Sequence, residues 1–99
     1  MATSEIHVFA RWKVKEGNKP DVLKLLKTLA SKTLSEKGNL FYRINQSKTD
    51  ASTLILFEGY TDESAQKAHV DSDHYKELAA KIIPLLDERE VFITTPLEE

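Results

Sequence analysis

Hydrophobic and polar residues alternate near the beginning of the chain, in the segment IHVFARWKV from Ile6 to Val14. An alternation with a period of two residues is typical of a β-strand that buries one of its faces. The apolar face of this predicted strand carries Ile6, Val8, Ala10, Trp12 and Val14. Three later apolar runs, NLFYRINQ at 39–46, STLILFEGY at 52–60 and EVFITT at 90–95, predict three further strands.

Between the first two strands, the residues expected to be buried recur with the spacing of an amphipathic helix. They are Val22, Leu25, Leu26, Leu29 and Thr33. Pro20 and Asp21 suit the first helical turn, where proline removes a backbone N–H that would have no partner and an acidic side chain is favoured. Gly38 follows the helical pattern and is expected to end the helix in the left-handed conformation.

The segment between the third and fourth strands predicts two short helices rather than one. Thr61 or Asp62 is expected to cap the first helix, which extends to about Val70. Ser72 is expected to cap the second helix, which continues until Pro84 because proline disturbs a helix interior. The predicted buried side of this second helix carries Tyr75, Leu78, Ala79 and Ile82.

The predicted elements follow the order β-α-β-β-α-β, with the second helix broken in two. This order is typical of an α+β, ferredoxin-like fold with an antiparallel four-stranded sheet, and the length suits a single domain over residues 1–99. Helices cover only one face of such a sheet, yet both faces of the third strand are apolar. Leu54 and Leu56 alternate with Ile55 and Phe57. An uncovered apolar face predicts a homodimer that packs sheet against sheet.

The composition narrows the class of protein. Fourteen lysines and arginines against sixteen aspartates and glutamates give a net charge of −2, which disfavours a nucleic-acid partner. The sequence has no apolar run long enough for a membrane span or a signal peptide, so we expect a cytoplasmic protein with no membrane partner. The absence of cysteine excludes disulfides, thiolate metal ligands and cysteine nucleophiles.

The stretch AHVDSDHYKEL, residues 68–78, raises the question of a metal site. His69 and His74 are five positions apart, which places them about 140° apart around a continuous helix. They would therefore not share a face, and no metal site is predicted. Asp71, Ser72 and Asp73 are residue types that cap helices at a break of this kind.

His69 follows two small residues, Ala65 and Ala68, on the predicted buried side of the first short helix. An imidazole in that position is either a core histidine whose hydrogen bonds are satisfied, or a general base in a pocket that the alanines leave open. The residues alone leave both interpretations open.

Two longer segments, KGNLFYRINQS and LILFEGYTDESAQKAHVDSDHYKEL, resemble the antibiotic biosynthesis monooxygenase family. The shared features are a strand opening G-N-L-x-Y, a strand with a glutamate just before its end, a helix reading A-x-x-x-H, and an S-x-H-Y turn. The resemblance implies a dimeric α+β barrel. It leaves the reaction open, because the family includes quinol monooxygenases, oxygenases of polyketide aromatic rings, haem-degrading enzymes, and an isomerase of the phosphorylated autoinducer-2 breakdown product.

The haem-degrading members differ from this chain at three positions. They carry an asparagine on the first strand, a tryptophan on the first short helix and a ligating histidine on the second. The matching positions here are Ala10, His69 and Ala79. We therefore predict that the protein binds no haem, and the same match suggests that His69 points into the family's pocket.

The sequence also lacks the glycine-rich motifs that bind nucleotide cofactors. Together with the resemblance, this predicts a cofactor-independent monooxygenase in which dioxygen oxidises a small quinol or phenol that a general base has deprotonated. His69 is the candidate base, and Glu58 is its candidate partner, either orienting the imidazole or binding a substrate hydroxyl. Candidate substrate-binding residues are Trp12, Asn39, Tyr42, His74 and Tyr75.

Two alternatives compete with the oxygenase. The same base and carboxylate would serve an isomerase of a small phosphorylated hydroxy-ketone, for which Arg11, Lys37 or Arg43 would bind the phosphate. The third hypothesis is a dimeric binding or stress-response module without catalysis. An aromatic slot favours the oxygenase, a small cavity with an arginine and a lysine favours the isomerase, and a filled cavity favours the module.

Overall fold

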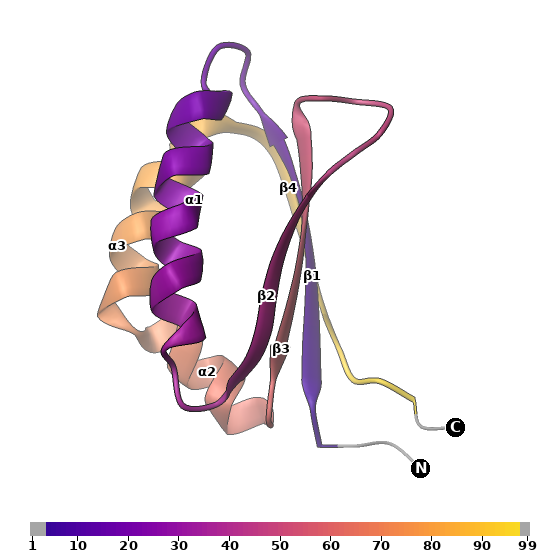
Figure 1. Ribbon diagram of the computed structural model, residues 1–99, viewed down its shortest axis with the longest axis vertical. Coiled ribbons are helices and arrows are strands. Elements are labelled where there is room, and N and C mark those ends of the chain that lie inside the picture. Colours follow the sequence, from indigo (N-terminus) through magenta and orange to yellow (C-terminus); the bar gives the residue numbers. More distant parts are fainter. Residues whose placement is uncertain (1–3, 98–99) are drawn as a thin grey trace.

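The chain folds into two layers, a twisted antiparallel sheet and a layer of helices on one of its faces (Figure 1). The computed structural model describes residues 4–97. Along the chain the elements are β1 (Ile6–Val14), α1 (Lys19–Leu34), β2 (Asn39–Gln46), β3 (Thr53–Tyr60), α2 (Glu63–Asp71), α3 (Asp73–Ile82), a 3-10 turn (Ile83–Leu85) and β4 (Leu86–Thr94). The sheet order is β2-β3-β1-β4, so the predicted ferredoxin-like fold is confirmed.

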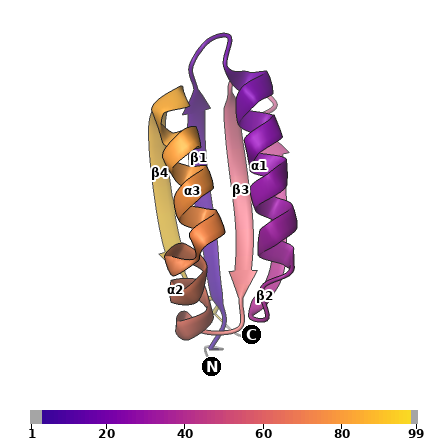
Figure 2. The same ribbon diagram turned by 90° about the vertical axis from the view of Figure 1, so that its left-hand side faces the viewer.

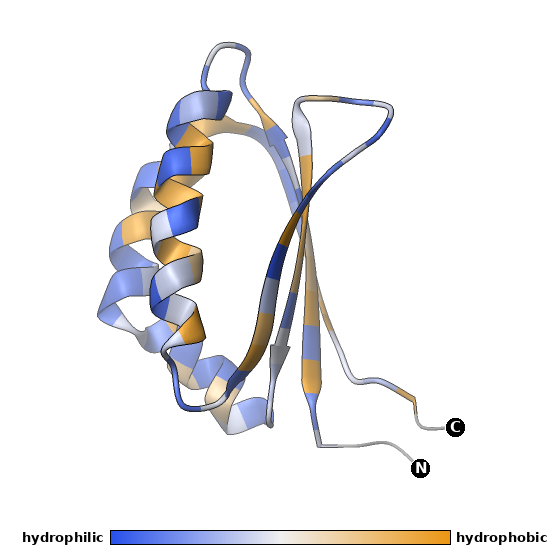
Figure 3. Ribbon diagram, in the orientation of Figure 1, coloured by the Kyte–Doolittle hydropathy of each residue, from blue (hydrophilic) through white to orange (hydrophobic). Residues whose placement is uncertain are grey.

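The hydrophobic core lies between the sheet and the helices. The apolar face of β1 is buried from Val8 to Val14, as the alternation predicted. Leu54 and Leu56 of β3 lie on the same side of the sheet and are almost fully buried. The hydrophobic residues of α1 run along the side of the helix that faces the sheet (Figure 3). From the helix side, α1 lies near β3 and β2, whereas α2 and α3 lie near β1 and β4 (Figure 2).

The predicted break between the two short helices is present, and its caps are those expected. The side chain of Asp62 accepts a hydrogen bond from the Ala65 backbone N–H at 2.8 Å, which caps α2. Ser72 has an extended backbone, and its hydroxyl oxygen accepts from the Tyr75 N–H at 3.2 Å, which caps α3. The polypeptide therefore changes direction at Ser72.

The predicted role of Gly38 is wrong, because α1 already ends at Leu34 and Ser35 has a right-handed backbone. Among the described residues, the only glycine with positive φ is Gly17, in the turn between β1 and α1. Gly38 instead permits a close approach between the α1–β2 turn and α2. A Cβ atom built at Gly38 would lie 2.3 Å from the Cβ of Ala65, so no larger residue fits there without displacement.

The last strand begins earlier than predicted, at Leu86 rather than at residue 90. The charged residues 87–90 hid this part of the strand from a search for apolar alternation. They can form an edge strand because the pairing with β1 uses backbone groups. Arg11 of β1 donates hydrogen bonds to Glu88 at 2.7 Å and to Glu90 at 2.6 Å across this pair.

The sheet face opposite the helices has no covering layer among residues 4–97. Its centre holds an aromatic cluster in which the Phe57 ring lies 4.6 Å from both the Phe9 and Phe41 rings, measured between centroids. Phe92 of β4 lies opposite Phe9 of β1 in the strand pairing, and it is 53% exposed. None of the helices in residues 4–97 is both long enough and apolar enough to cross a membrane.

Candidate active site

A small cavity of about 50 Å³ lies between the sheet and the helices, near the break between α2 and α3. Strands β1, β2 and β3 contribute Trp12, Tyr42 and Glu58 to its wall, and α2 and α3 contribute His69 and Tyr75. Five residues that the sequence predicted for the site therefore border one cavity. The wall also includes Val91 of β4, which is 41% exposed, so the cavity is bordered by a surface residue on that side.

His69 lies in the last turn of α2 and is only 3% exposed. Its Nδ1 atom is 2.9 Å from Oε2 and 3.2 Å from Oε1 of Glu36. A carboxylate only accepts hydrogen bonds, so we assign the ring hydrogen to Nδ1. The lone pair is then on Nε2, which lies 3.9 Å from Oε1 of Glu58. This tautomer suits a general base, with one nitrogen held by a carboxylate and the other free to accept a proton.

Glu58 is the second carboxylate of the site and is buried, with 7% of the residue exposed. Burial raises its pKa to about 7, against the opposing effect of a hydrogen bond that the Tyr60 hydroxyl donates at 2.7 Å. Burial also lowers the pKa of His69, while the Glu36 carboxylate acts in the opposite direction. Glu58 therefore exchanges its proton near neutral pH, which is the range that acid–base catalysis requires, and the pKa of His69 lies below its ordinary value because the ring is buried.

The residue that orients His69 is Glu36, which sequence reasoning missed. The predicted partner, Glu58, lies near His69 but farther away than hydrogen-bond distance. Glu36 comes from the α1–β2 turn, 33 positions before His69, and no local pattern marks it. Its Oε2 atom also lies 2.6 Å from Nε2 of His74. The expectation that the two histidines face apart is wrong, because it assumed one continuous helix and the chain bends at Ser72 between them.

Three aromatic residues predicted as walls for a flat ring border the cavity. Tyr42 and Trp12 are buried on the sheet side, and Trp12 Nε1 has no hydrogen-bond partner among the described residues. The Tyr75 ring lies 4.9 Å from the His69 ring, and its hydroxyl accepts a long hydrogen bond of 3.4 Å from Arg89. Burial raises the pKa of Tyr42, so its phenol stays neutral and can only act as a hydrogen-bonding wall.

Asn39 lies outside the cavity wall. Its side-chain amide donates to the backbone carbonyls of Phe41 and Gly59, at 3.1 and 3.2 Å. The bond to Gly59 joins β2 to β3 where the register between the strands shifts, and the bond to Phe41 lies within β2. Asn39 therefore holds the start of β2 by hydrogen bonds to backbone carbonyls and does not line the cavity.

The proposed phosphate-binding cations also lie outside the cavity. Arg11 is engaged with two glutamates on the outer face, and Arg43 lies over the Phe41 ring. Lys37 borders a separate groove. The cation at the cavity is Arg89, which the sequence did not indicate because the residues around it were not recognised as strand.

Tyr60 is another functional neighbour that was missed, although a signal for it exists. It is two positions from Glu58 in a strand, so both side chains point to the same face. Gln66 also borders the cavity, one turn before His69 on α2.

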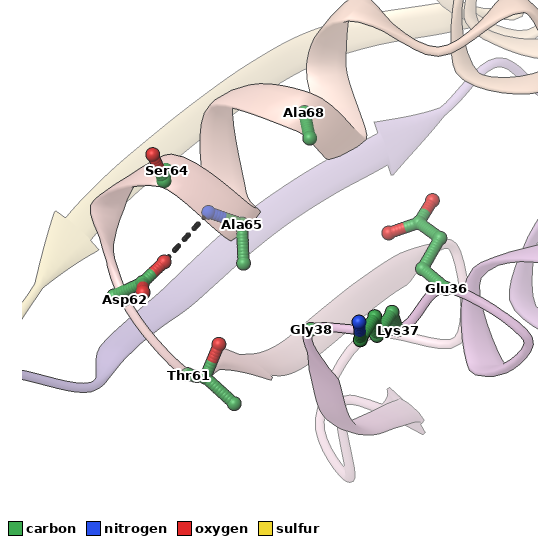
Figure 4. Close-up of a pocket in the computed structure, with 8 residues that line it drawn as sticks. All are labelled: Glu36, Lys37, Gly38, Thr61, Asp62, Ser64, Ala65 and Ala68. Atoms are coloured by element: carbon green, nitrogen blue, oxygen red, sulfur yellow. Dashed lines mark hydrogen bonds between the residues drawn. The ribbon is translucent and has the colours of Figure 1, made fainter.

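A wide groove of about 740 Å³ opens beside Glu36 (Figure 4). The turn residues Glu36, Lys37 and Gly38 form one side, and Ala65 and Ala68 of α2 belong to the other. The groove and the small cavity are distinct in their lining residues, but the Glu36–His69 hydrogen bond connects their walls.

Comparisons with known proteins identify relatives of this chain. A family model described as antibiotic biosynthesis monooxygenase matches residues 5–81. A Bacillus subtilis (strain 168) protein with the name "Putative monooxygenase YcnE" is 28% identical over 87 residues, which cover 88% of this chain and 92% of that protein.

Two solved structures also resemble this chain over nearly their whole lengths. A conserved protein from Methanosarcina mazei Go1 is 31% identical with a TM-score of 0.89, covering 93% of this chain and 92% of the other. Rv0793 from Mycobacterium tuberculosis is 29% identical with a TM-score of 0.91, covering 97% and 98%. Because the family model spans most of the sequence and the fold agrees, the chain belongs to the antibiotic biosynthesis monooxygenase family.

Proposed function

We propose that the protein is a monooxygenase that oxidises a small quinol or phenol with dioxygen and uses no flavin, haem or metal as a cofactor. The observation that carries the proposal is the buried acid–base arrangement at the aromatic-lined cavity. His69 is held through Nδ1 by Glu36, and its Nε2 atom faces the buried carboxylate of Glu58. The family name supports a monooxygenase, and the choice of substrate rests on the chemistry of the site.

In the proposed reaction, Nε2 of His69 accepts the proton of a substrate hydroxyl. The resulting phenolate is electron-rich enough to pass one electron to dioxygen, and the two radicals combine to form a carbon–oxygen bond. Glu58 binds the second hydroxyl and, with its pKa near 7, donates a proton when the oxygen–oxygen bond breaks. One quinol and one dioxygen then give one hydroxyquinone and one water, so the substrate supplies all four electrons that dioxygen accepts.

The size of the cavity restricts the substrate. A cavity of roughly 150 Å³ holds a benzene molecule, whereas this one measures about 50 Å³. Ring binding therefore requires a movement of the wall, and we expect Tyr75 and Arg89 to separate because only one long hydrogen bond joins them. A one-ring quinol needs a smaller movement than a fused aromatic system, so one-ring quinols are the proposed substrate class.

Oxygen consumption with a panel of one-ring and two-ring quinols tests the proposal. Removal of a general base typically lowers the rate by about 10² to 10⁴, so His69→Ala should approach the rate of autoxidation. Glu36→Gln should retain more activity, because the amide still hydrogen-bonds to the imidazole. Incorporation of one atom of ¹⁸O per product molecule from labelled dioxygen would identify a monooxygenase rather than an oxidase.

His7→Gln is the matched control. His7 also contacts a glutamate, Glu5, at 3.0 Å, but it lies on the outer face of the sheet. This variant should keep the wild-type rate. Equal rates for wild type and His69→Ala would remove the histidine from the mechanism, and no rate above autoxidation on any quinol would favour the non-catalytic module.

We further propose that two copies of the chain pack through the uncovered sheet face. Phe9, Phe41, Phe57 and Phe92 lie on or border that face, and an exposed apolar patch of this kind is typical of an interaction site. Sedimentation of the protein at low micromolar concentration should show a species of twice the 11.3 kDa chain mass. A monomer under these conditions would contradict the proposed dimer.

A further inference from the structure

Glu36, His69 and His74 converge on one point beside the cavity. Each of the three side chains offers one atom that could bind a metal ion, and these three atoms lie within 4.8 Å of one another. Oε2 of Glu36 is 2.9 Å from Nδ1 of His69 and 2.6 Å from Nε2 of His74. We propose that these three side chains bind one divalent transition-metal ion, with Zn²⁺ as the representative ion.

Three different elements bring the ligands together. Glu36 comes from the α1–β2 turn, His69 from the end of α2 and His74 from the start of α3. The extended backbone at Ser72 makes this possible, since it turns α3 away from the direction of α2. Ser72 also fixes the turn, because its hydroxyl donates to the His69 carbonyl at 2.6 Å while it caps α3. The supporting backbone is therefore held independently of any ion.

The ligand atoms lie close to the spacing of metal ligands. Bonds of about 2.0–2.2 Å from a tetrahedral ion to histidine nitrogen and carboxylate oxygen place neighbouring ligand atoms roughly 3.3–3.6 Å apart. The two histidine–glutamate distances, 2.9 and 2.6 Å, are shorter, so binding an ion requires the ligand atoms to move apart by less than about 1 Å. The side chain of His74 is 23% exposed and that of His69 is 4% exposed, so His74 is the ligand with room to adjust.

A second carboxylate is available to support the bound form. A histidine that binds a metal usually donates its other ring N–H to a carboxylate or carbonyl. When an ion occupies Nδ1 of His69, the ring hydrogen moves to Nε2, which faces Oε1 of Glu58 at 3.9 Å. Glu58 is in turn held by the Tyr60 hydroxyl at 2.7 Å. An approach of about 1 Å would bring Glu58 within hydrogen-bond distance of Nε2, as the outer acceptor that such histidines use.

The groove in Figure 4 provides an entry route to the carboxylate. Glu36 is one of its lining residues and its carboxylate points toward α2, so an ion can reach Oε2 from solvent without passing through the cavity. Ala65 and Ala68 leave this route open because their side chains are small.

Two imidazole nitrogens and one carboxylate oxygen favour Zn²⁺, Cu²⁺, Ni²⁺ or Fe²⁺ over Mg²⁺ and Ca²⁺, which prefer oxygen ligands. Three protein ligands leave at least one coordination position open to solvent or a small ligand.

Binding of the metal ion does not depend on the proposed oxygenase reaction. If the protein both binds the ion and oxidises quinols, the ion would occupy Nδ1 of His69, the nitrogen that Glu36 now holds. We therefore expect the ion to inhibit the oxygenase reaction and not to act as its cofactor.

Isothermal titration calorimetry on tag-free protein stripped with EDTA tests the site. We expect saturable binding of one Zn²⁺ per chain, no comparable signal for Mg²⁺, and a thermal shift on adding Zn²⁺ that follows the calorimetric saturation. His74→Gln and Glu36→Gln should each weaken Zn²⁺ binding by at least roughly ten- to a hundredfold. A loss of that size is typical even when the changed residue only hydrogen-bonds to a metal ligand. His7→Gln removes a histidine–glutamate pair elsewhere and should bind as the wild type does.

Co²⁺ gives a second readout that does not require the variants to be equally stable. Its visible absorption bands should appear on binding to the wild type and should change in intensity and position in His74→Gln. Absence of saturable Zn²⁺ binding by the wild type would overturn the proposal. Wild-type affinity in both His74→Gln and Glu36→Gln would overturn it as well, because the ion would then lie elsewhere. Since no substrate is present, neither result depends on the oxygenase activity.

Discussion

Replacing Gly38 by alanine tests whether the α1–β2 turn is held against α2 by close packing. The Cβ atom of the alanine would lie 2.3 Å from the Cβ of Ala65 and 3.2 Å from Oγ1 of Thr61. Ordinary contacts begin at about 3.4 Å, so the turn and α2 would have to separate by about 1 Å (3.4 − 2.3). The hydrogen bond from Thr61 N–H to Gly38 O, now 2.9 Å, would be strained by the same movement.

The expected loss follows from the cost of overpacking. Extra atoms in a closely packed contact typically cost about 1–3 kcal/mol. For a domain of this length, that corresponds to a fall in Tm of roughly 5–20 °C, because about 1 kcal/mol shifts Tm by 4–8 °C. Gly38 does not have a positive φ, so alanine adds no backbone strain at this position. The loss of stability therefore measures the cost of the close contact with α2.

A double-mutant cycle isolates that contact. Ala65→Gly alone should cost about 1 kcal/mol, because glycine is unfavourable in a helix. In the double variant with Gly38→Ala the clash is gone, so its free energy of unfolding should nearly equal that of Ala65→Gly. Urea denaturation of the four proteins measures the coupling. If the two single losses simply add, or if Gly38→Ala leaves Tm unchanged, the proposed close contact is wrong.

Two further predictions concern Glu58 and the outer sheet face. Burial raises the pKa of Glu58 from 4.5 to about 7, so its contribution to stability is present below pH 4.5 and lost as the pH rises through 7. At roughly 1.4 kcal/mol per pKa unit the full loss is about 3.5 kcal/mol. Between pH 5 and pH 8, in buffer that contains EDTA, the free energy of unfolding of Glu58→Gln should therefore fall less than that of the wild type. An equal fall in both proteins, measured by urea denaturation at each pH, would contradict this. Phe57→Asp should shift the sedimenting species to the monomer, because burying an unpaired charge costs several kcal/mol. Ser31→Asp, an equal charge on the exposed side of α1, should leave the association unchanged, and a dimer of Phe57→Asp would contradict the assigned face.

Much of the fold was determined by local patterns in the sequence. Several features depend on interactions within a few residues, so they can be predicted directly from the sequence. They are the period-two alternation of β1, the Asp62 and Ser72 caps, and the end of α3 before Pro84. The start of β4 was missed because its first residues are charged, and only pairing with Arg11 and the backbone of β1 makes them a strand.

The site was predicted only in part, because some of its residues are recognisable by type and position in the sequence and others are not. His69, Glu58 and the aromatic walls Trp12, Tyr42 and Tyr75 stand out in the sequence, and they border one cavity. By itself the sequence determined which residue types could act as base and wall. The tertiary structure alone decided that Glu36, 33 positions away, holds the base and meets His74 beyond the bend at Ser72. Such contacts depend on how turns and helices pack across the core, and the spacing of residues along the chain does not encode that distance.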